Sequence, residues 1–439
     1  MSIDVQSAKE REILGMPVSL FWGFVSVFLF MVGDGVEQAF LSKYMVQLGF
    51  SVNQSAMVFS IYGITLAIAS WLSGVLAEIW GPRRAMVLGF IIWVVFDVGF
   101  LYFGLDHKNY AMMLVMYGLR GFGYPLFSFS FIVWISYVSE KDKLGSAMGW
   151  FWFVFAGGLG FIGSYYPSFT IPVFGFMGTL WSSLVWIIVG GLLGILLIRE
   201  KSDFSETASD RQVSVEREHG NRLGELVKGI TIAFENPRVG MGGIVRVINT
   251  SAQYGFVVIL PIFFTQTLHF STSQWLQIWG DMSISNMIFN LIWGMVGDKI
   301  GWRAQVKWFG GVGCAITSLF FYYGPLAAGH NYWVAVLASV LFGITLAGFV
   351  PLSAIMPSLA PNHKGASMSI LNLGAGLSTF VGPAIVGLLN NSFGVQGIVW
   401  TFAVLYIVSA ILTHFLEVQK TSEDPRTGLV GHASANERL

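Results

Sequence analysis

Long apolar runs separated by short polar turns dominate this chain from residue 17 onward. A helix needs about 20 apolar residues to cross the roughly 30 Å hydrocarbon core of a bilayer, and the runs have that length. The pattern therefore predicts an all-α membrane protein with about twelve membrane-crossing helices. We expect these helices at residues 17–46, 53–79, 84–104, 109–137, 145–168, 175–198, 240–268, 274–297, 303–324, 332–356, 366–389 and 394–416.

The composition agrees with a protein that is mostly embedded in a lipid bilayer. Of the 439 residues, 54% are hydrophobic and 11% are charged, and the mean hydropathy is +0.67. Soluble domains have about 45–50% apolar and about 25% charged residues. The lipid bilayer is thus the expected surrounding, and the net charge of +0 gives no reason to expect a nucleic-acid partner.

The positive charges lie mostly on one side of the predicted bundle. Of the 24 Lys and Arg residues, all but Lys43, Lys108, Arg120 and Arg246 fall in segments on the same side as the amino terminus. Loops rich in Lys and Arg face the cytoplasm in membrane proteins. Both termini are therefore expected in the cytoplasm. The first helix is expected to be retained, because no cleavage site follows it.

A constant offset of 220 residues relates the two halves of the sequence. The residues in matching positions are Gly74 and Gly294, Glu78 and Asp298, Gly81 and Gly301, and Arg83 and Arg303, with Arg84 next to the first set. The same offset aligns residues 145–148 with 365–368. The repeat predicts two six-helix halves, residues 17–198 and 240–416. A cytoplasmic amino-terminal segment (1–16), a partly helical linker (199–239) and a carboxy-terminal tail (417–439) complete the chain.

The glycine, acid, glycine and arginine pattern, present after the second helix and again after the eighth, resembles the signature of the major facilitator superfamily. Within it, residues 31–51, 117–133, 246–250 and 361–366 resemble bacterial polyol permeases that carry ribitol and D-arabinitol. The resemblance implies a monomeric importer in the bacterial inner membrane, linked to a cation gradient. A neighbouring branch is known as permeases for 2-oxoglutarate, and this supplies the alternative substrate. The motif residues are expected to gate, holding neighbouring helix ends on the inner side.

Three ionisable residues are the candidates for coupling to protons. Asp34 and Glu37 lie one turn apart in the first helix, and Arg120 lies in the fourth. A charged side chain at bilayer depth costs about 2.5–3.5 kcal/mol, so such residues need partners or a wet cavity. Protonation of an acid would break its pair with Arg120, as in similar proton-linked sugar carriers that this sequence resembles. A static ion pair that only joins two helices remains open.

Amide and aromatic side chains are the candidates for binding the substrate. A polyol needs partners that both donate and accept hydrogen bonds, which amides supply. The candidates, several of them at helical spacing, are Gln38, Trp150, Arg246, Asn249, Gln253, Trp279, Asn286, Asn290 and Asn372. Further aromatic faces for C–H packing are Trp152, Tyr254 and Trp275. Each amide could instead join two helices, which is common in membrane bundles.

Other chemistry is not indicated. The seven histidines show no helical pair at metal spacing, and no Gly-Lys-Ser or Gly-Lys-Thr forms a phosphate loop, so we expect neither metal nor cofactor. An enzyme would need a nucleophile, base and acid set, and a receptor would need a signalling domain beyond the tail. Asp97 is expected to make an interhelical hydrogen bond, and Asp281 receives no role. A 2-oxoglutarate permease would use Arg120 and Arg246 as a two-point clamp.

Overall fold

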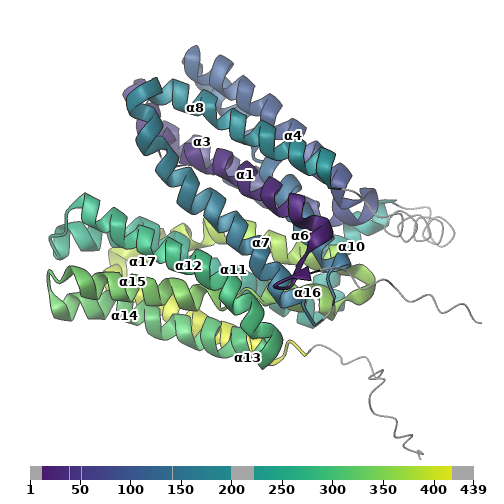
Figure 1. Ribbon diagram of the computed structural model, residues 1–439. Coiled ribbons are helices and arrows are strands. Elements are labelled where there is room, and N and C mark those ends of the chain that lie inside the picture. Colours follow the sequence, from purple (N-terminus) through teal and green to yellow (C-terminus); the bar gives the residue numbers. More distant parts are fainter. Residues whose placement is uncertain (1–11, 39, 51, 141, 199–221, 418–439) are drawn as a thin grey trace, which may run out of the picture.

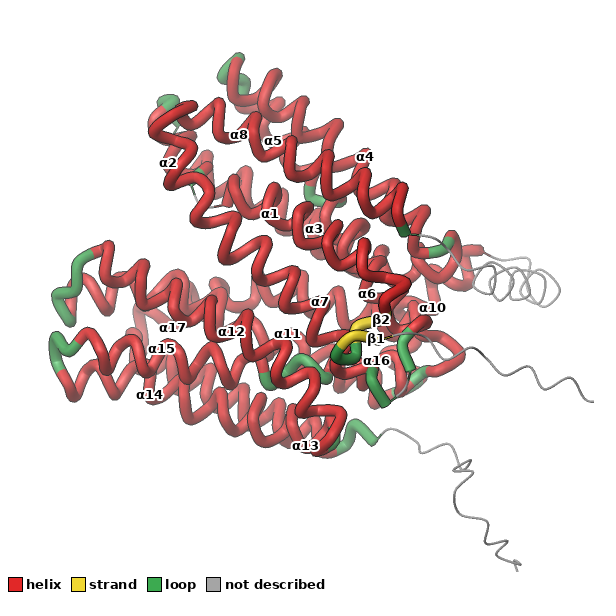
Figure 2. Tube along the Cα trace, viewed as in Figure 1, coloured by secondary structure: helices red, strands yellow, loops and turns green. Residues whose placement is uncertain are grey.

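A computed structural model describes residues 12–38, 40–50, 52–140, 142–198 and 222–417. Helices make up almost all of this part of the chain (Figures 1 and 2). The helices of the first half are α1 (Phe21–Gln38), α2 (Leu41–Gln47), α3 (Val52–Trp80), α4 (Pro82–Gly99), α5 (Tyr110–Arg120), α6 (Ser130–Val138), α7 (Leu144–Ala156) and α8 (Gly163–Leu197). Those of the second half are α11 (Pro237–Ile262), α12 (Thr272–Ile300), α13 (Trp302–Gln305), α14 (Gly313–Ala328), α15 (Tyr332–Ala347), α16 (Leu352–Leu359) and α17 (Lys364–His414).

Short π- and 3-10-helical stretches join several of these helices into longer crossings. The π-helical stretches are η2 (Phe100–Asp106), η3 (Pro125–Phe129), η4 (Gly157–Ile162), η5 (Phe263–Thr267) and η6 (Val306–Val312), and the 3-10 turns are η1 (Val18–Leu20) and η7 (Pro361–His363). In the described residues, 11 stretches are long and apolar enough to cross a membrane. α12 is not among them, although its 29 residues have the required length. Its polar side chains, described below, explain its lower hydropathy.

The repeat seen in the sequence is also present in the backbone. α8 and α17 each contain a sharp turn at a glycine, Gly175 with φ of 70° and Gly394 with φ of 58°. The motif glycines Gly81 and Gly301 also have positive φ, 85° and 95°. An L side chain is disfavoured there, which explains glycine at each of these four turns. The first crossing was expected to be one helix over residues 17–46. The structure has two helices there, since α1 ends at Gln38 and α2 begins at Leu41.

The two halves meet through two equivalent helix pairs. α3 packs against α17, and α7 packs against α12. In Figure 1 the halves converge at the end where α10 and α16 lie and diverge toward the opposite end. We call the converging end the closed end.

Two further elements lie at the closed end (Figure 2). β1 (Glu12–Ile13) and β2 (Met16–Pro17) form a hairpin, and Trp150 of α7 donates to the carbonyl of Leu14 in its turn. The predicted helical piece of the linker corresponds to α10 (Arg222–Glu235), which packs against α3, α11 and α17. Residues 1–11, 199–221 and 418–439, where we expect the rest of the cytoplasmic segments, lie outside the described residues.

The contact between α7 and α12 depends on the absence of side chains. A Cβ at Gly294 would lie 2.7 Å from the carbonyl oxygen of Gly145 and 2.8 Å from Cα of Gly149. We expect Gly294→Val to force the halves apart at the closed end, since overpacking costs about 1–3 kcal/mol, or roughly a five- to hundredfold shift in the closed population. Distances between spin labels at Trp80 and Ile300, exposed at the ends of α3 and α12, measure this.

Gly280 offers the matched control on the same helix. Its nearest neighbour for an added Cβ, the Tyr165 hydroxyl, is 3.8 Å away. Gly280→Val should leave the label distances unchanged. Equal distances in Gly294→Val and the parent protein would show that this glycine contact does not hold the closed end.

Candidate functional site

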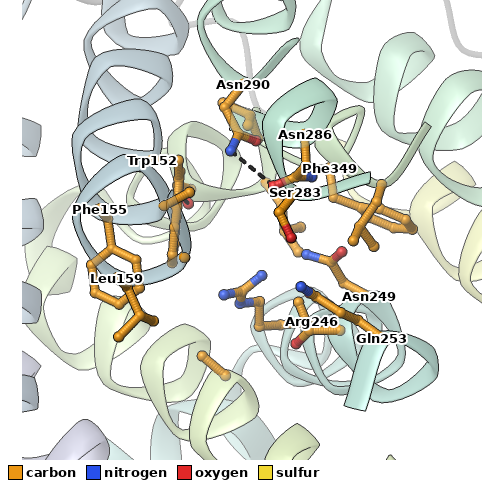
Figure 3. A pocket seen from close by; sticks show the side chains of 18 of the residues that line it. Trp152, Phe155, Leu159, Arg246, Asn249, Gln253, Ser283, Asn286, Asn290 and Phe349 are labelled. Atoms are coloured by element: carbon orange, nitrogen blue, oxygen red, sulfur yellow. Dashed lines mark hydrogen bonds between the residues drawn. The ribbon is translucent and has the colours of Figure 1, made fainter. Parts of the chain in front are cut away.

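A cavity of about 170 Å³ lies between the two halves. One wall comes from α11 and α12, and the other includes α7 and the segment after α5 (Figure 3). Its charged, amide and hydroxyl groups include Arg246, Asn249, Gln253, Ser283, Asn286 and Asn290. Aromatic side chains on the walls include Tyr124, Trp152, Phe155, Tyr254 and Phe349. The cavity therefore combines hydrogen-bonding groups with flat apolar surfaces.

Arg246 brings a positive charge into this cavity. The residue is 8% exposed, and its guanidinium carbon lies 4.8 Å from the ring centre of Trp152 (Figure 3). This cation–π contact offsets part of the cost of burial. Within the described ranges no carboxylate forms an ion pair with Arg246, and its Nε has no hydrogen-bond partner. The arginine thus keeps hydrogen-bonding capacity for a solute in the cavity.

The amides on α11 and α12 differ in how far their hydrogen-bonding groups are already used. On α12, Asn290 donates to Asn286, which donates to the carbonyl of Gly343 on α15, both at 3.2 Å. On α11, Oδ1 of Asn249 is buried and has no hydrogen-bond partner among the described residues. Gln253 likewise lacks a side-chain hydrogen bond there. The α12 amides are therefore partly used in holding helices together, whereas the α11 amides are open.

A second polar group lies inside the first half, away from the cavity. Nη1 of Arg120 donates to Oε2 of Glu37 on α1 and to Oδ1 of Asp97 on α4, the latter at 2.7 Å. All three side chains are 0% exposed. An isolated buried ion costs several kcal/mol, so these residues stabilise one another. None of them is among the residues that line the cavity.

Asp34 adjoins this group through a tryptophan. Trp93 Nε1 donates to Oδ1 of Asp34 at 2.9 Å, and the Arg120 guanidinium carbon lies 4.7 Å from the Trp93 ring centre. We call Asp34, Glu37, Asp97 and Arg120 the charged cluster. The predicted pair of Glu37 with Arg120 is present. The interhelical hydrogen bond expected for Asp97 is also present, and its donor is that same arginine on α5.

Several predicted binding residues lie elsewhere. Trp150 contacts the amino-terminal hairpin at the closed end, and Trp279 packs against Trp275, with ring centres 5.6 Å apart, outside the cavity lining. Asn372 donates to Ser73 Oγ at 3.0 Å and so joins α17 to α3 across the halves. Helical spacing places these residues on the polar faces of their helices, but it does not predict which other helix packs against each face. The side chain of Gln38 lies outside the described residues.

Among the lining residues that the sequence analysis does not name, Ser283 and Tyr124 have a spacing that carries a signal. Ser283 lies four residues after Trp279 and three before Asn286, hence on the polar stripe of α12. Tyr124 lies four residues after Arg120 and lines the cavity, while Arg120 lies in the charged cluster. The crossing that contains α5 and the segment after it therefore contributes to both the charged cluster and the cavity.

The two motif acids bind helix starts of the opposite half at the closed end. Asp298 accepts from the backbone N–H groups of Gly145 and Ser146 at 2.9 and 2.8 Å, at the start of α7. Glu78 accepts from the backbone N–H of Ala366 at 3.0 Å, at the start of α17. A carboxylate is stabilised at a helix amino terminus by free N–H groups and the helix dipole. These bonds hold the closed end together.

The motif arginines act within their own halves. Arg83 donates to the carbonyl of Ile195 at 2.6 Å, and Arg303 donates to Glu417 at 3.1 Å. Arg84 is exposed. Gly74 and Gly294 allow close helix approach, since a Cβ at Gly74 would lie 2.5 Å from the carbonyl oxygen of Gly365. The acids thus bridge the halves, and the arginines hold the ends of each half.

A helical membrane bundle built from two repeats around a central cavity is the architecture of secondary transporters. The family model described as Major Facilitator Superfamily matches this sequence in two overlapping stretches, residues 23–327 and 242–435. The chain belongs to this superfamily. The fold is also similar to the solved proton:xylose symporter XylE, with a TM-score of 0.68 and 16% identity, covering 91% of this chain and 95% of that one.

Three relatives align over 94% of the chain. The "Alpha-ketoglutarate permease" of Bacillus subtilis is 45% identical, with 93% of its length covered. The "D-arabinitol transporter" and the "Ribitol transporter" of Klebsiella pneumoniae are 43% and 44% identical, with 96% and 95% covered. The chain is therefore a multi-pass membrane transporter of a small molecule and not an enzyme, with relatives that carry polyols.

Proposed function

We propose that the protein imports five-carbon sugar alcohols, D-arabinitol or ribitol, across the bacterial inner membrane by proton symport. In this proposal a monomer with both termini in the cytoplasm rocks residues 17–198 against 240–416, so that the cavity opens to one side at a time. The linker, residues 199–239, stays on the cytoplasmic side, which corresponds to the closed end. The names of the two Klebsiella pneumoniae relatives support this substrate class.

The observation that carries the proposal is the open hydrogen-bonding capacity on α11. Arg246 Nε and Asn249 Oδ1 are buried without partners among the described residues, and Gln253 lies beside them (Figure 3). An unpaired buried donor or acceptor costs about 1–3 kcal/mol. A polyol satisfies donors and acceptors together, because each hydroxyl does both. Trp152, across the cavity, offers an apolar surface to the C–H groups of the polyol.

Proton coupling supplies enough energy for accumulation. One positive charge that moves inward through about 100 mV releases about 2.3 kcal/mol, or a concentration ratio of roughly fifty. The proposed coupling residues are Asp34, Glu37 and Arg120, because they are buried in the half that also lines the cavity through Tyr124. Proton binding there would alter the contacts of Arg120, one turn from the cavity.

A second candidate substrate is 2-oxoglutarate, and a specific observation favours it. Arg246 has no carboxylate partner within the described ranges, and a substrate carboxylate would supply one. The expected two-arginine clamp is wrong for this conformation, however. Arg120 is paired with Glu37 and Asp97 and does not line the cavity. A dianion would therefore be held by one arginine and the neighbouring amides.

Removing either α11 amide should weaken pentitol binding without loss of the fold. For Asn249→Ala and Gln253→Ala we expect the half-saturating concentration of D-arabinitol or ribitol to rise roughly two- to tenfold, since each loses one or two hydrogen bonds. Exchange of labelled pentitol in proteoliposomes measures this. Gln277→Ala, on an exposed side chain outside the cavity, is the control and should behave as the parent protein. Unchanged half-saturation in both amide variants would remove the α11 site from the proposal.

Arg246 separates the two candidate substrates. With a neutral pentitol, Arg246→Gln should raise the half-saturating concentration by roughly tenfold, because only hydrogen bonds are altered. With 2-oxoglutarate the loss should exceed about a hundredfold, and Arg246→Lys should recover part of it. Competition of both solutes against labelled pentitol, in parent protein and variants, decides between them. If 2-oxoglutarate displaces the label and pentitols do not, the polyol assignment is overturned.

A further inference from the structure

Two carboxylates in the charged cluster meet on a single nitrogen. Glu37 Oε2 and Asp97 Oδ1 both accept from Nη1 of Arg120. A hydrogen bond to nitrogen is about 3 Å long, so these two oxygens lie within about 6 Å of each other. The acids come from different helices, α1 and α4, which α5 connects through the arginine. The arrangement is therefore a pair of acids around one cation and not two separate ion pairs.

The second oxygen of each acid has no partner. Oε1 of Glu37 and Oδ2 of Asp97 are buried and make no hydrogen bond within the described residues, and neither do Nε and Nη2 of Arg120. The titratable and charged groups around the pair are Asp34 on α1, Tyr62 on α3, and Tyr117 and Arg120 on α5. Arg120 is the one cation in this set.

The charges do not balance if every acid is ionised. One guanidinium neutralises one carboxylate, so Glu37, Asp97 and Arg120 together would carry one excess negative charge. A buried charge without a partner is strongly destabilising. Elsewhere, two neighbouring carboxylates avoid this cost by sharing one proton. The two unpartnered oxygens are the positions at which that proton could bind.

We propose that Glu37 and Asp97 share one proton and that this carboxyl pair is the proton-binding site of the transport cycle. This inference rests on the proposed proton symport. Asp34 is then a positioning residue, fixed by Trp93, whose ring also packs beside Arg120. When the proton leaves for solvent, both acids are ionised against one guanidinium. The excess charge is relieved only if the acids separate or water enters, and either change alters the packing of α1, α4 and α5.

The shared proton has a spectroscopic signature. A protonated carboxyl group gives an infrared C=O absorption that shifts in heavy water and vanishes on ionisation. We expect a pH-difference spectrum of the purified protein to show one such band, lost in both Glu37→Gln and Asp97→Asn. Asp34→Asn should retain it. Asp281→Asn, an acid on α12 outside the cluster and the cavity, is the control.

Transport assays separate this inference from the proposed function. Asp97→Asn should still exchange labelled pentitol but should no longer accumulate it under a pH gradient. Should this variant fail to fold, Asp97→Glu keeps a carboxyl group and is expected to shift the band. A band identical to the parent's in Asp97→Asn or Asp97→Glu would overturn the shared proton. Absence of gradient-driven accumulation in the parent protein would instead contradict proton symport itself.

Discussion

Arg120 is the residue on which the interior of the first half depends. It lies at the end of α5, with Glu37 and Asp97 bonded to one of its nitrogens and Trp93 and Tyr117 rings beside it. Without this guanidinium, two carboxylates would be buried without a counter-ion, at a cost of several kcal/mol each. The same residue connects three helices, so the electrostatic requirement and the packing of the half are satisfied together.

The chain next to Arg120 is built for close contact and for bending. A Cβ at Gly121 would lie 2.2 Å from Oγ1 of Thr65, and one at Gly123 would lie 2.5 Å from Cβ of Trp93. Pro125 then begins a π-helical stretch. Tyr124, between the glycines and the proline, reaches the cavity. A change of charge on the acids bonded to Arg120 can therefore reach the cavity through an interrupted helix, which is a common site of bending.

The two halves are alike at the closed end and different in the middle. Asp298 and Glu78 make equivalent bonds to helix starts of the opposite half. At bilayer depth, by contrast, the first half contains acids that surround Arg120, and the second half presents Arg246 and open amides to the cavity. This division supports the separation of proton binding from solute binding in the proposed mechanism.

Sequence periodicity was sufficient for most helices and for the polar stripe on α11, because these depend on local spacing, and the constant offset between matching residues was sufficient for the repeat. It was not sufficient where the answer depends on which helices are neighbours. Asn372, expected among the substrate-binding residues, bonds instead to Ser73 on α3. Trp150 was misplaced in the same way, since its partner is the hairpin before the first helix. Long-range packing decides each of these.

The central claim is that proton entry and solute entry occur together. The most direct test records external pH while D-arabinitol or ribitol is added to proteoliposomes that contain the purified protein and no imposed gradient. We predict that the external medium becomes alkaline as solute enters. We also predict that the entry of both solute and protons ceases when no other ion can cross the membrane to balance the charge that the protons carry. Solute entry with no change in external pH would contradict it.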